Sequence, residues 1–181
     1  MTEQELTAHV LAARNGDRAA QDALVQAFLR PAYAVALGVL RHVADAEDIA
    51  QESLLRALGT LDQCREPARF AAWLLQSVRH RALNLLHQRG NRARLLGALP
   101  QSQDIAPAPL AARQRLLSAL EVLNAAQREV VLLHDLQDWT HAEIAAALEI
   151  TETMSRQHLF VARRAMRKHL DDGTGKEVVD G

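Results

Sequence analysis

Apolar residues recur every three to four positions along most of this 181-residue chain. This period predicts amphipathic helices, because it places the apolar side chains on one side of a helix. Polar turn residues or prolines interrupt the pattern at Asn15-Gly16-Asp17, Pro31, Asp45 and Pro67. In the first half of the chain we therefore expect helices at about 3–14, 18–29, 31–42, 46–58 and 67–88.

The periodic pattern stops between about residues 90 and 108, where glycine and proline stand among Gln, Ser and Asp, as is typical of a linker. It resumes at about 110–123, 126–136, 140–148 and 152–170, and we expect the polar segment from Gly173 to be disordered. The predicted fold class is all-α. Two small helical domains, 1–95 and 110–170, are joined by a flexible linker at 96–109 and followed by a tail at 171–181.

Two of the later helices form a helix-turn-helix pattern. Thr140 can cap the first of them while Glu143 reaches back to its amide, and Thr151 starts the second in the same way. A helix of this kind fits the DNA major groove, where its side chains reach base edges while arginines neutralise phosphates. The cations follow in a run without acids: Arg156, Arg163, Arg164, Arg167 and Lys168.

Composition restricts the kind of core, the cellular compartment and the covalent links that we expect for the protein. Apolar residues make up 49% of the chain but aromatic residues only 3%, so alanine and leucine supply most of the core. No continuous apolar run approaches the ~20 residues of a membrane span, and the N-terminus lacks the zones of a signal peptide, so we expect a cytoplasmic protein without membrane insertion. Cys64 is the only cysteine, which excludes an internal disulfide.

Charge is distributed unevenly along the chain. The net charge of −1 argues weakly against nucleic-acid binding when taken as an average. However, arginines gather without acids between Arg79 and Arg94, whereas Asp45, Glu47, Asp48 and Glu52 crowd one short segment. Two basic surfaces and one acidic surface suggest two DNA contacts and one protein contact.

The acidic segment has a distinct face. Asp48, Gln51, Glu52 and Leu55 share one side of the expected helix, whereas Ile49 and Leu54 can point inward. We expect Asp45 to be the N-cap, with the acids of the first turn complementing the helix dipole. Such a face suits a basic helical partner, and a merely solvated face remains the alternative.

The helix from Pro67 carries an apolar stripe of Phe70, Leu74, Val78, Ala82 and Leu85, which predicts its core side. The other stripe could contact phosphates and bases, although a solvated basic face is commoner. Phe70 and Trp73 are the aromatics near the polar loop before this helix that could stack on an unpaired base, and both are more often core residues. The polar stripe consists of Gln76, His80, Asn84 and His87, flanked by Arg79.

The last helix directs Leu159, Ala162, Met166 and Leu170 inward, which leaves its arginines and Phe160 toward solvent or DNA. Phe160 could pack against deoxyribose or a thymine methyl, or against Trp139 or the neighbouring helix.

Enzymatic chemistry has little support. His134, Asp135, His141 and Glu143 do not complete a metal site, because the two histidines are separated across a predicted helix break. Nothing positions a base or an oxyanion hole near Cys64. We therefore expect no enzyme, no metal and no cofactor.

Taken together, these segments resemble the extracytoplasmic-function (ECF) sigma factors of the bacterial sigma-70 family. The resemblance covers nearly the whole chain, and any one motif is weak alone, whereas their common order is specific. The matching motifs are Ala13-Arg14-Asn15-Gly16-Asp17, the Asp45–Glu52 block, Phe70-Ala71-Ala72-Trp73-Leu74 before Arg79, and Leu123–Leu132 before Glu143-Ile144-Ala145.

The resemblance implies a sigma factor that binds core RNA polymerase and directs promoter recognition and transcription initiation. The partners it implies are the beta-prime clamp coiled coil and beta flap of the polymerase, promoter DNA and, as a further candidate, an anti-sigma factor. It assigns core binding to Asp45, Asp48, Gln51, Glu52 and Leu55; minus-ten DNA to Gln63, Arg65, Phe70, Trp73, Arg79, His80 and Asn84; and minus-thirty-five DNA to Thr153, Arg156, Gln157, Phe160, Arg163 and Arg164.

The recognition region departs from the family pattern. The family usually has glycine at the positions of Glu149 and Thr153, a β-branched apolar residue at Ser155, arginine at His158 and a basic residue at Val161. Loss of a base-facing cation at Val161 is expected to weaken or redirect minus-thirty-five readout. A glycine at a turn often serves a left-handed conformation, so we expect Glu149 to strain the turn or to change it.

Two other functions stay open from the sequence. One is a sigma-like decoy that binds polymerase or an anti-sigma factor without initiating. The other is a helix-turn-helix regulator that works without polymerase and does not need the acidic face.

Overall fold

The computed structural model describes residues 1–96 and 110–174 of the chain. Helices make up its regular structure, in agreement with the predicted all-α class. The first domain contains α1 (Glu3–Arg14), α2 (Arg18–Leu40), α3 (Val43–Gly59), the short 3₁₀ turns η1 (Leu61–Gln63) and η2 (Pro67–Arg69), and α4 (Phe70–Leu96). The second contains α5 (Leu110–Glu121), α6 (Ala125–Gln137), α7 (His141–Leu148) and α8 (Glu152–Thr174). The predicted linker and most of the predicted tail lie outside the described residues.

The predicted break at Pro31 is wrong, because α2 continues through this residue to Leu40. Proline removes one backbone hydrogen bond from a helix interior. Pro31 and every residue from Ala34 to Leu40 are buried, so tertiary packing of α2 outweighs that loss. α2 is long and apolar enough to cross a membrane by length and composition alone, but 61% of its most apolar window is buried, as in the core helix of a folded domain.

Other helix ends also differ from expectation. α3 begins at Val43 with His42 as its N-cap, whose ring nitrogen accepts from the Asp45 amide, so the prediction of Asp45 as the cap is wrong. Gly90 lies within α4, which extends to Leu96, and α8 runs to Thr174, past the predicted domain end at 170. The capping box of Thr140 and Glu143 and the cap by Thr151 are confirmed.

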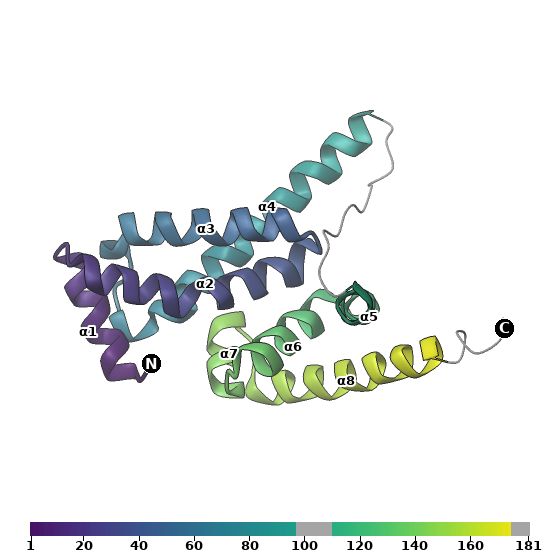
Figure 1. Ribbon diagram of the computed structural model, residues 1–181. Coiled ribbons are helices and arrows are strands. Elements are labelled where there is room, and N and C mark those ends of the chain that lie inside the picture. Colours follow the sequence, from purple (N-terminus) through teal and green to yellow (C-terminus); the bar gives the residue numbers. More distant parts are fainter. Residues whose placement is uncertain (97–109, 175–181) are drawn as a thin grey trace.

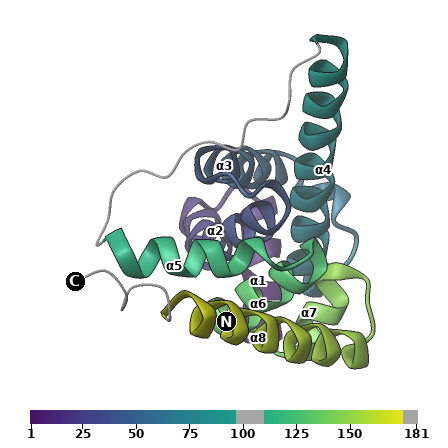
Figure 2. The same ribbon diagram turned by 90° about the vertical axis from the view of Figure 1, so that its right-hand side faces the viewer.

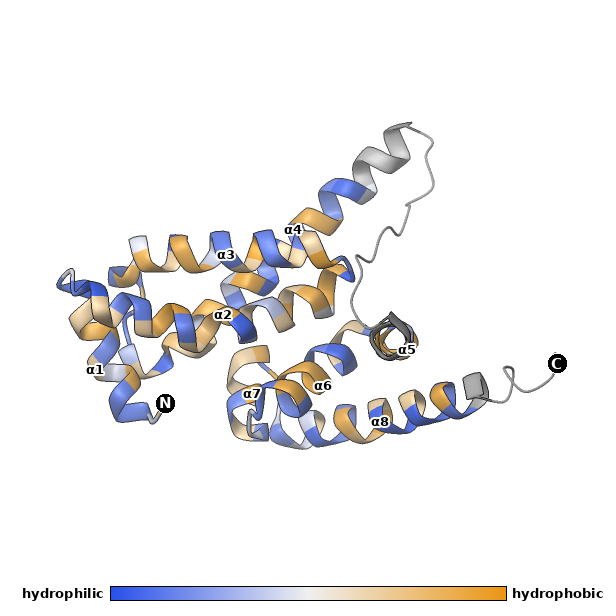
Figure 3. Cartoon of the chain, in the orientation of Figure 1, coloured by the Kyte–Doolittle hydropathy of each residue, from blue (hydrophilic) through white to orange (hydrophobic). Residues whose placement is uncertain are grey.

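The two domains pack against each other (Figure 1). Residues on α2 contact α6, and residues on α4 contact α7, so that one apolar core continues through both domains. Figures 1 and 2 show α3 and α8 on opposite sides of the molecule, with α2 and α6 between them. Apolar residues recur among polar ones along α8 (Figure 3), as expected for a surface helix with one apolar side.

A buried arginine joins the domains. Arg128 of α6 is 6% exposed, and its guanidinium donates to the carbonyls of Leu120, Leu123 and Gly38. Leu120 lies in the last turn of α5, and Leu123 lies in the connection between α5 and α6. Gly38 belongs to α2 of the other domain. One side chain therefore satisfies backbone acceptors in both domains.

Candidate functional site

The outer face of α3 is exposed as predicted. Asp48 and Gln51 face solvent, and Leu55 is 70% exposed, the largest exposed fraction among the large apolar side chains of the described residues. On the opposite face, Ile49 and Leu54 are buried at 9% and 2% exposure. The structure thus brings an acid, an amide and an apolar residue together on one open surface.

Two of the acids predicted for this face have partners within the chain. Asp45 is paired with Arg89 of α4, and the hydrogen bond from Arg89 holds the pKa of the Asp45 carboxyl below its ordinary value. Glu52 is paired with Arg81 of α4, although its side chain remains 63% exposed. Asp48 is the acid of the predicted set that stays unpaired among the described residues.

The loop between α3 and α4 is anchored from inside. Leu61 and Cys64 are buried, whereas Gln63, which lies between them in the sequence, and Arg65, which follows Cys64, are exposed. Arg14 of α1 donates to the carbonyl oxygens of Leu61, at 3.1 Å, and of Cys64. Burial raises the pKa of the Cys64 thiol, and its Sγ donates to the carbonyl of Glu66 at 3.3 Å. The two predicted DNA residues of the loop therefore project from a fixed backbone.

Phe70 is not available to a base in this structure. Its side chain is 0% exposed, and its ring meets Phe28 edge-on with centroids 5.4 Å apart. Of the two predicted stacking residues, only Trp73 is partly exposed, with its ring centroid 5.9 Å from that of Phe70. Phe70 is therefore a core residue, and its prediction as a DNA contact is wrong for this structure.

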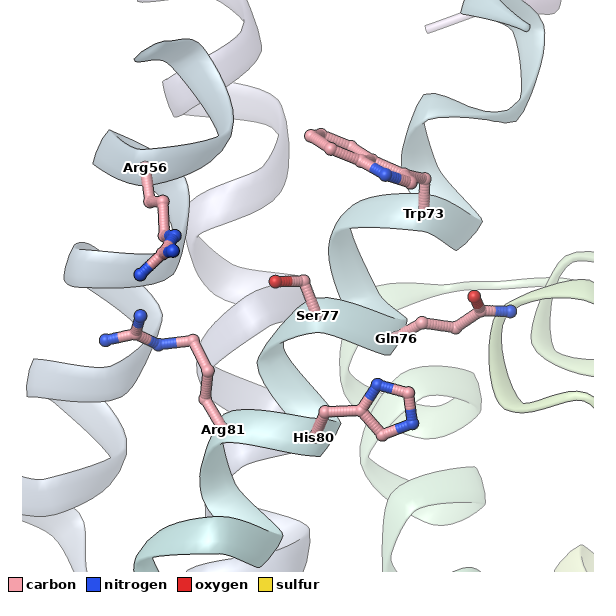
Figure 4. Close-up of a pocket in the computed structure, with 6 residues that line it drawn as sticks. All are labelled: Arg56, Trp73, Gln76, Ser77, His80 and Arg81. Atoms are coloured by element: carbon pink, nitrogen blue, oxygen red, sulfur yellow. The ribbon is translucent and has the colours of Figure 1, made fainter. Parts of the chain in front are cut away.

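A hollow of about 480 Å³ lies between α3 and α4. It includes Trp73 and His80, both predicted from the sequence, while Asn84 is exposed one turn beyond His80. Gln76 belongs to the predicted polar stripe as well, whereas the sequence analysis did not assign Arg56, Ser77 and Arg81 to DNA. The lining is Arg56, Trp73, Gln76, Ser77, His80 and Arg81 (Figure 4).

Arg79 of α4 faces the second domain. Its Nε lies 3.3 Å from both carboxylate oxygens of Glu129 on α6. The Glu129 side chain is 1% exposed, and burial raises its pKa while Arg79 opposes that rise. Arg79, which was predicted to contact DNA, is therefore paired with the Glu129 carboxylate of the same chain.

The outer face of α8 carries the predicted recognition residues. Thr153, Gln157 and Arg164 are exposed, and Phe160 is 68% exposed, so most of the Phe160 side chain is open to solvent. Two predicted cations have partners: Arg156 pairs with Glu152 at 2.7 Å, and Arg163 pairs with Asp135 of α6 at 2.5 Å. Although burial opposes ionisation of Asp135, hydrogen bonds from Arg163 and His134 lower its pKa.

Comparison with known proteins decides the family. The family models "Sigma-70 region 2" and "Sigma-70, region 4" match residues 24–92 and 113–166. The chain is 34% identical over 170 residues to the ECF RNA polymerase sigma factor SigL of Mycobacterium tuberculosis, covering 87% of this chain and 95% of SigL. The chain belongs to the ECF sigma factors.

Other relatives of this sigma factor agree. The ECF RNA polymerase sigma-E factor of Salmonella typhimurium is 30% identical, over 90% of this chain and 94% of its own length. The probable RNA polymerase sigma factor RfaY of Xanthomonas campestris is 34% identical over 86% of this chain, which spans 41% of RfaY.

Solved structures share the fold of this sigma factor. The sigma factor RpoE in complex with the anti-sigma factor NepR from Bartonella quintana aligns with a TM-score of 0.70 at 23% identity, over 83% of this chain and 96% of RpoE. CnrH in complex with the cytosolic domain of CnrY aligns with a TM-score of 0.68 at 22% identity, over 93% of this chain and 98% of CnrH.

The structure also explains one departure in the recognition region of this sigma factor. Ser155 is fully buried, and its hydroxyl lies 2.9 Å from Nδ1 of His141, whose ring stacks on that of His134 with centroids 4.8 Å apart. Ser155 and His141 thus join α8 to α7. Among the described residues there is no group of three or more candidate metal ligands.

Proposed function

We propose that this ECF sigma factor binds core RNA polymerase through the outer face of α3 and directs it to a two-part promoter through the 61–66 loop, α4 and α8. Family membership supports the role in transcription initiation. The observation that carries the assignment of surfaces is the separation of an unpaired acid beside an exposed leucine on α3 from cationic surfaces on α4 and α8. Such a protein acts in the cytoplasm, where its polymerase works.

Asp48, Gln51 and Leu55 form the centre of the polymerase contact. Leu55 supplies apolar area and Asp48 supplies charge, the combination that gives an interface both affinity and orientation. Asp45 and Glu52 contribute at its edge and hold Arg89 and Arg81 of α4 in place. The clamp coiled coil of the beta-prime subunit is the basic helical partner of this face, and the second domain meets the beta flap.

Gln63, Arg65, Trp73, His80 and Asn84 serve the minus-ten element. The anchored loop presents Gln63 and Arg65 to an unpaired base at low entropic cost, because Arg14 already fixes its backbone. Arg79 joins this surface when a phosphate replaces Glu129 as its partner. The two domains must therefore separate at this contact when the promoter is bound.

The minus-thirty-five element is read by α8. Thr153, Gln157 and Phe160 face outward among Arg156, Arg163 and Arg164, so apolar, amide and cationic groups are presented together to the major groove. Val161 is 47% exposed where the family usually carries a cation, which predicts a different base preference at that position.

Transcription in vitro with core enzyme tests this function. Promoter sequences are first selected from a random library by the reconstituted holoenzyme. We expect initiation that depends on both the core and this chain. Polymerase binding without initiation would support the decoy, and selection of duplex DNA by the chain alone would support the independent regulator.

A further inference from the structure

A buried polar contact links the two helices of the helix-turn-helix. Ser155 lies in the first turn of α8 and is 0% exposed. Its hydroxyl is 2.9 Å from Nδ1 of His141, the first residue of α7. Where the family usually has an apolar side chain, this chain therefore has a hydrogen bond. A hydrogen bond is directional, so it fixes the rotation of α8 relative to α7.

A second contact holds α8 further along its length. Arg163 donates to both carboxylate oxygens of Asp135 on α6, at 2.5 and 3.2 Å. Nδ1 of His134 lies 2.9 Å from the same carboxylate, and the His134 ring stacks on the His141 ring with centroids 4.8 Å apart. The contacts from Ser155 to Arg163 therefore form one continuous chain that begins and ends on α8.

The two attachment points set the orientation of α8. Ser155 and Arg163 are eight positions apart, which is about 12 Å along the axis of an α-helix. Fixing both points determines the direction of the helix as well as its rotation. Gln157 and Phe160 lie between them and are exposed on the proposed minus-thirty-five surface. The chain of contacts therefore controls how the side chains that face DNA are aimed.

The centre of this chain of contacts is sensitive to charge. Burial and the neighbouring cations hold the pKa of His141 below the ordinary histidine value of 6.5. α4 also contacts α7, but none of the charged groups described on α4 shifts this pKa. On α7 itself, the Glu143 carboxylate is engaged by the Thr140 cap. The groups that act on His141 come from α6 and α8: His134, Arg156 and Arg163 oppose its protonation, and Glu152 favours it.

We propose that His141 and Ser155 position α8 for the minus-thirty-five element, and that this positioning requires an uncharged His141. The inference rests on the proposed function. A proton on His141 puts a positive charge against the His134 ring and near two arginines of α8, which weakens the joint between α6, α7 and α8. Both are positioning residues, because they act on DNA binding through the orientation of α8.

The direction of the pH dependence follows from the lowered pKa. His141 takes up a proton more easily when the joint is open than when it is closed, so low pH favours the open joint. The closed joint has its full stability above about pH 6.5, the ordinary value for histidine, and loses stability as the pH falls below it. Readout of the minus-thirty-five element should therefore weaken in mildly acidic solution.

The test compares promoters with an intact and a scrambled minus-thirty-five element. Affinities of the reconstituted holoenzyme for both duplexes are measured between about pH 5.5 and pH 8, the range in which histidine titrates. Their ratio reports minus-thirty-five readout, because changes in the polymerase or in the minus-ten contacts affect both duplexes. The wild-type ratio should be constant above about pH 6.5 and fall below it, by at most about tenfold per pH unit for one proton.

Four variants separate positioning from general effects, and circular dichroism checks that each keeps its helices. Ser155→Ala and His141→Ala each remove the hydrogen bond, so the ratio should fall about fivefold at pH values above about 7. His141→Asn keeps a hydrogen-bonding group that does not titrate, so it should restore the ratio and make it independent of pH. His9→Asn, at a histidine of α1, is the matched control and should keep the wild-type pH profile.

Three results would overturn the inference. One is a wild-type ratio that stays constant with pH or follows the profile of His141→Asn. Another is a Ser155→Ala variant with the wild-type ratio. A third is an equal loss of affinity for both duplexes in the alanine variants, which would assign the joint to folding alone. A wild-type holoenzyme that does not distinguish the two duplexes at about pH 8 would instead contradict the proposed function.

Discussion

Glu149 ends α7 in the left-handed region, with φ 56°. Its side chain is exposed, so the conformation is imposed by the turn and not by a contact of the carboxylate. A residue with a Cβ pays about 1–2 kcal/mol for this conformation, whereas glycine adopts it freely but loses more entropy on folding. The expected strain at this turn is therefore present in the backbone.

Replacing Glu149 tests that strain. Glu149→Gly should stabilise the full chain by about 1 kcal/mol, because glycine relieves the left-handed penalty. Glu149→Ala keeps a Cβ at the same φ and should not stabilise. The midpoint of thermal unfolding measures both variants, and a destabilised glycine variant would contradict this account of the turn.

At single positions, the sequence predicts exposure better than pairing. The inward stripes of α4 and α8 and the outward position of Phe160 follow from helical period and are confirmed. Asp45 and Phe70 show the limit. A period of 3.6 residues predicts the core side of Phe70 but cannot reveal its partner Phe28, nor that Arg89, 44 residues away, pairs with Asp45.

At the scale of elements, the sequence predicts that the helices exist and predicts some of their ends, such as both ends of α1, but not the ends near Pro31 and Gly90. Pro31 and Gly90 are local helix breakers by propensity, yet α2 and α4 run through them. In α2 the reason is burial on several sides, which only the folded chain supplies. The sequence predicts a helix cap where a preferred N-cap residue stands, as at Thr140. Histidine is not among the preferred N-cap residues, so the cap by the His42 imidazole could not be predicted.

The hollow between α3 and α4 also belongs to this scale. Arg56 and Arg81 are 25 positions apart, and each alone looks like an ordinary surface cation. Their meeting depends on the crossing of α3 and α4, which the hydrophobic pattern does not determine. Loop anchoring by Arg14 is a second feature that only the assembled helices reveal.

At the scale of the whole molecule, the two predicted domains pack against each other through α2 and α6 and through α4 and α7. Sequence periodicity showed each domain but not their packing. The contact depends on Gly38, where an added Cβ would lie 2.8 Å from Cγ of Glu129 and 3.3 Å from the Glu129 Cα and backbone N. The backbone of α6 approaches α2 closely because glycine leaves space there.

Gly38→Ala should therefore open the molecule. The added methyl meets backbone atoms of α6, and overpacking of this kind costs about 1–3 kcal/mol. We expect a larger radius of gyration in solution scattering than for the wild type. Gly90→Ala is the matched control, because no atom lies within 4 Å of a Cβ added there, and it should leave the radius unchanged. An unchanged radius in Gly38→Ala would show that this contact does not hold the domains together.

The central claim is that α3 binds the polymerase, and the affinity of charge-reversed variants for purified core enzyme tests it most directly. Asp48→Lys places a cation opposite a basic partner and should weaken binding by about tenfold or more. Asp22→Lys changes the net charge equally at an exposed acid of α2 and should bind like the wild type. Equal affinities for Asp48→Lys and wild type would contradict the account.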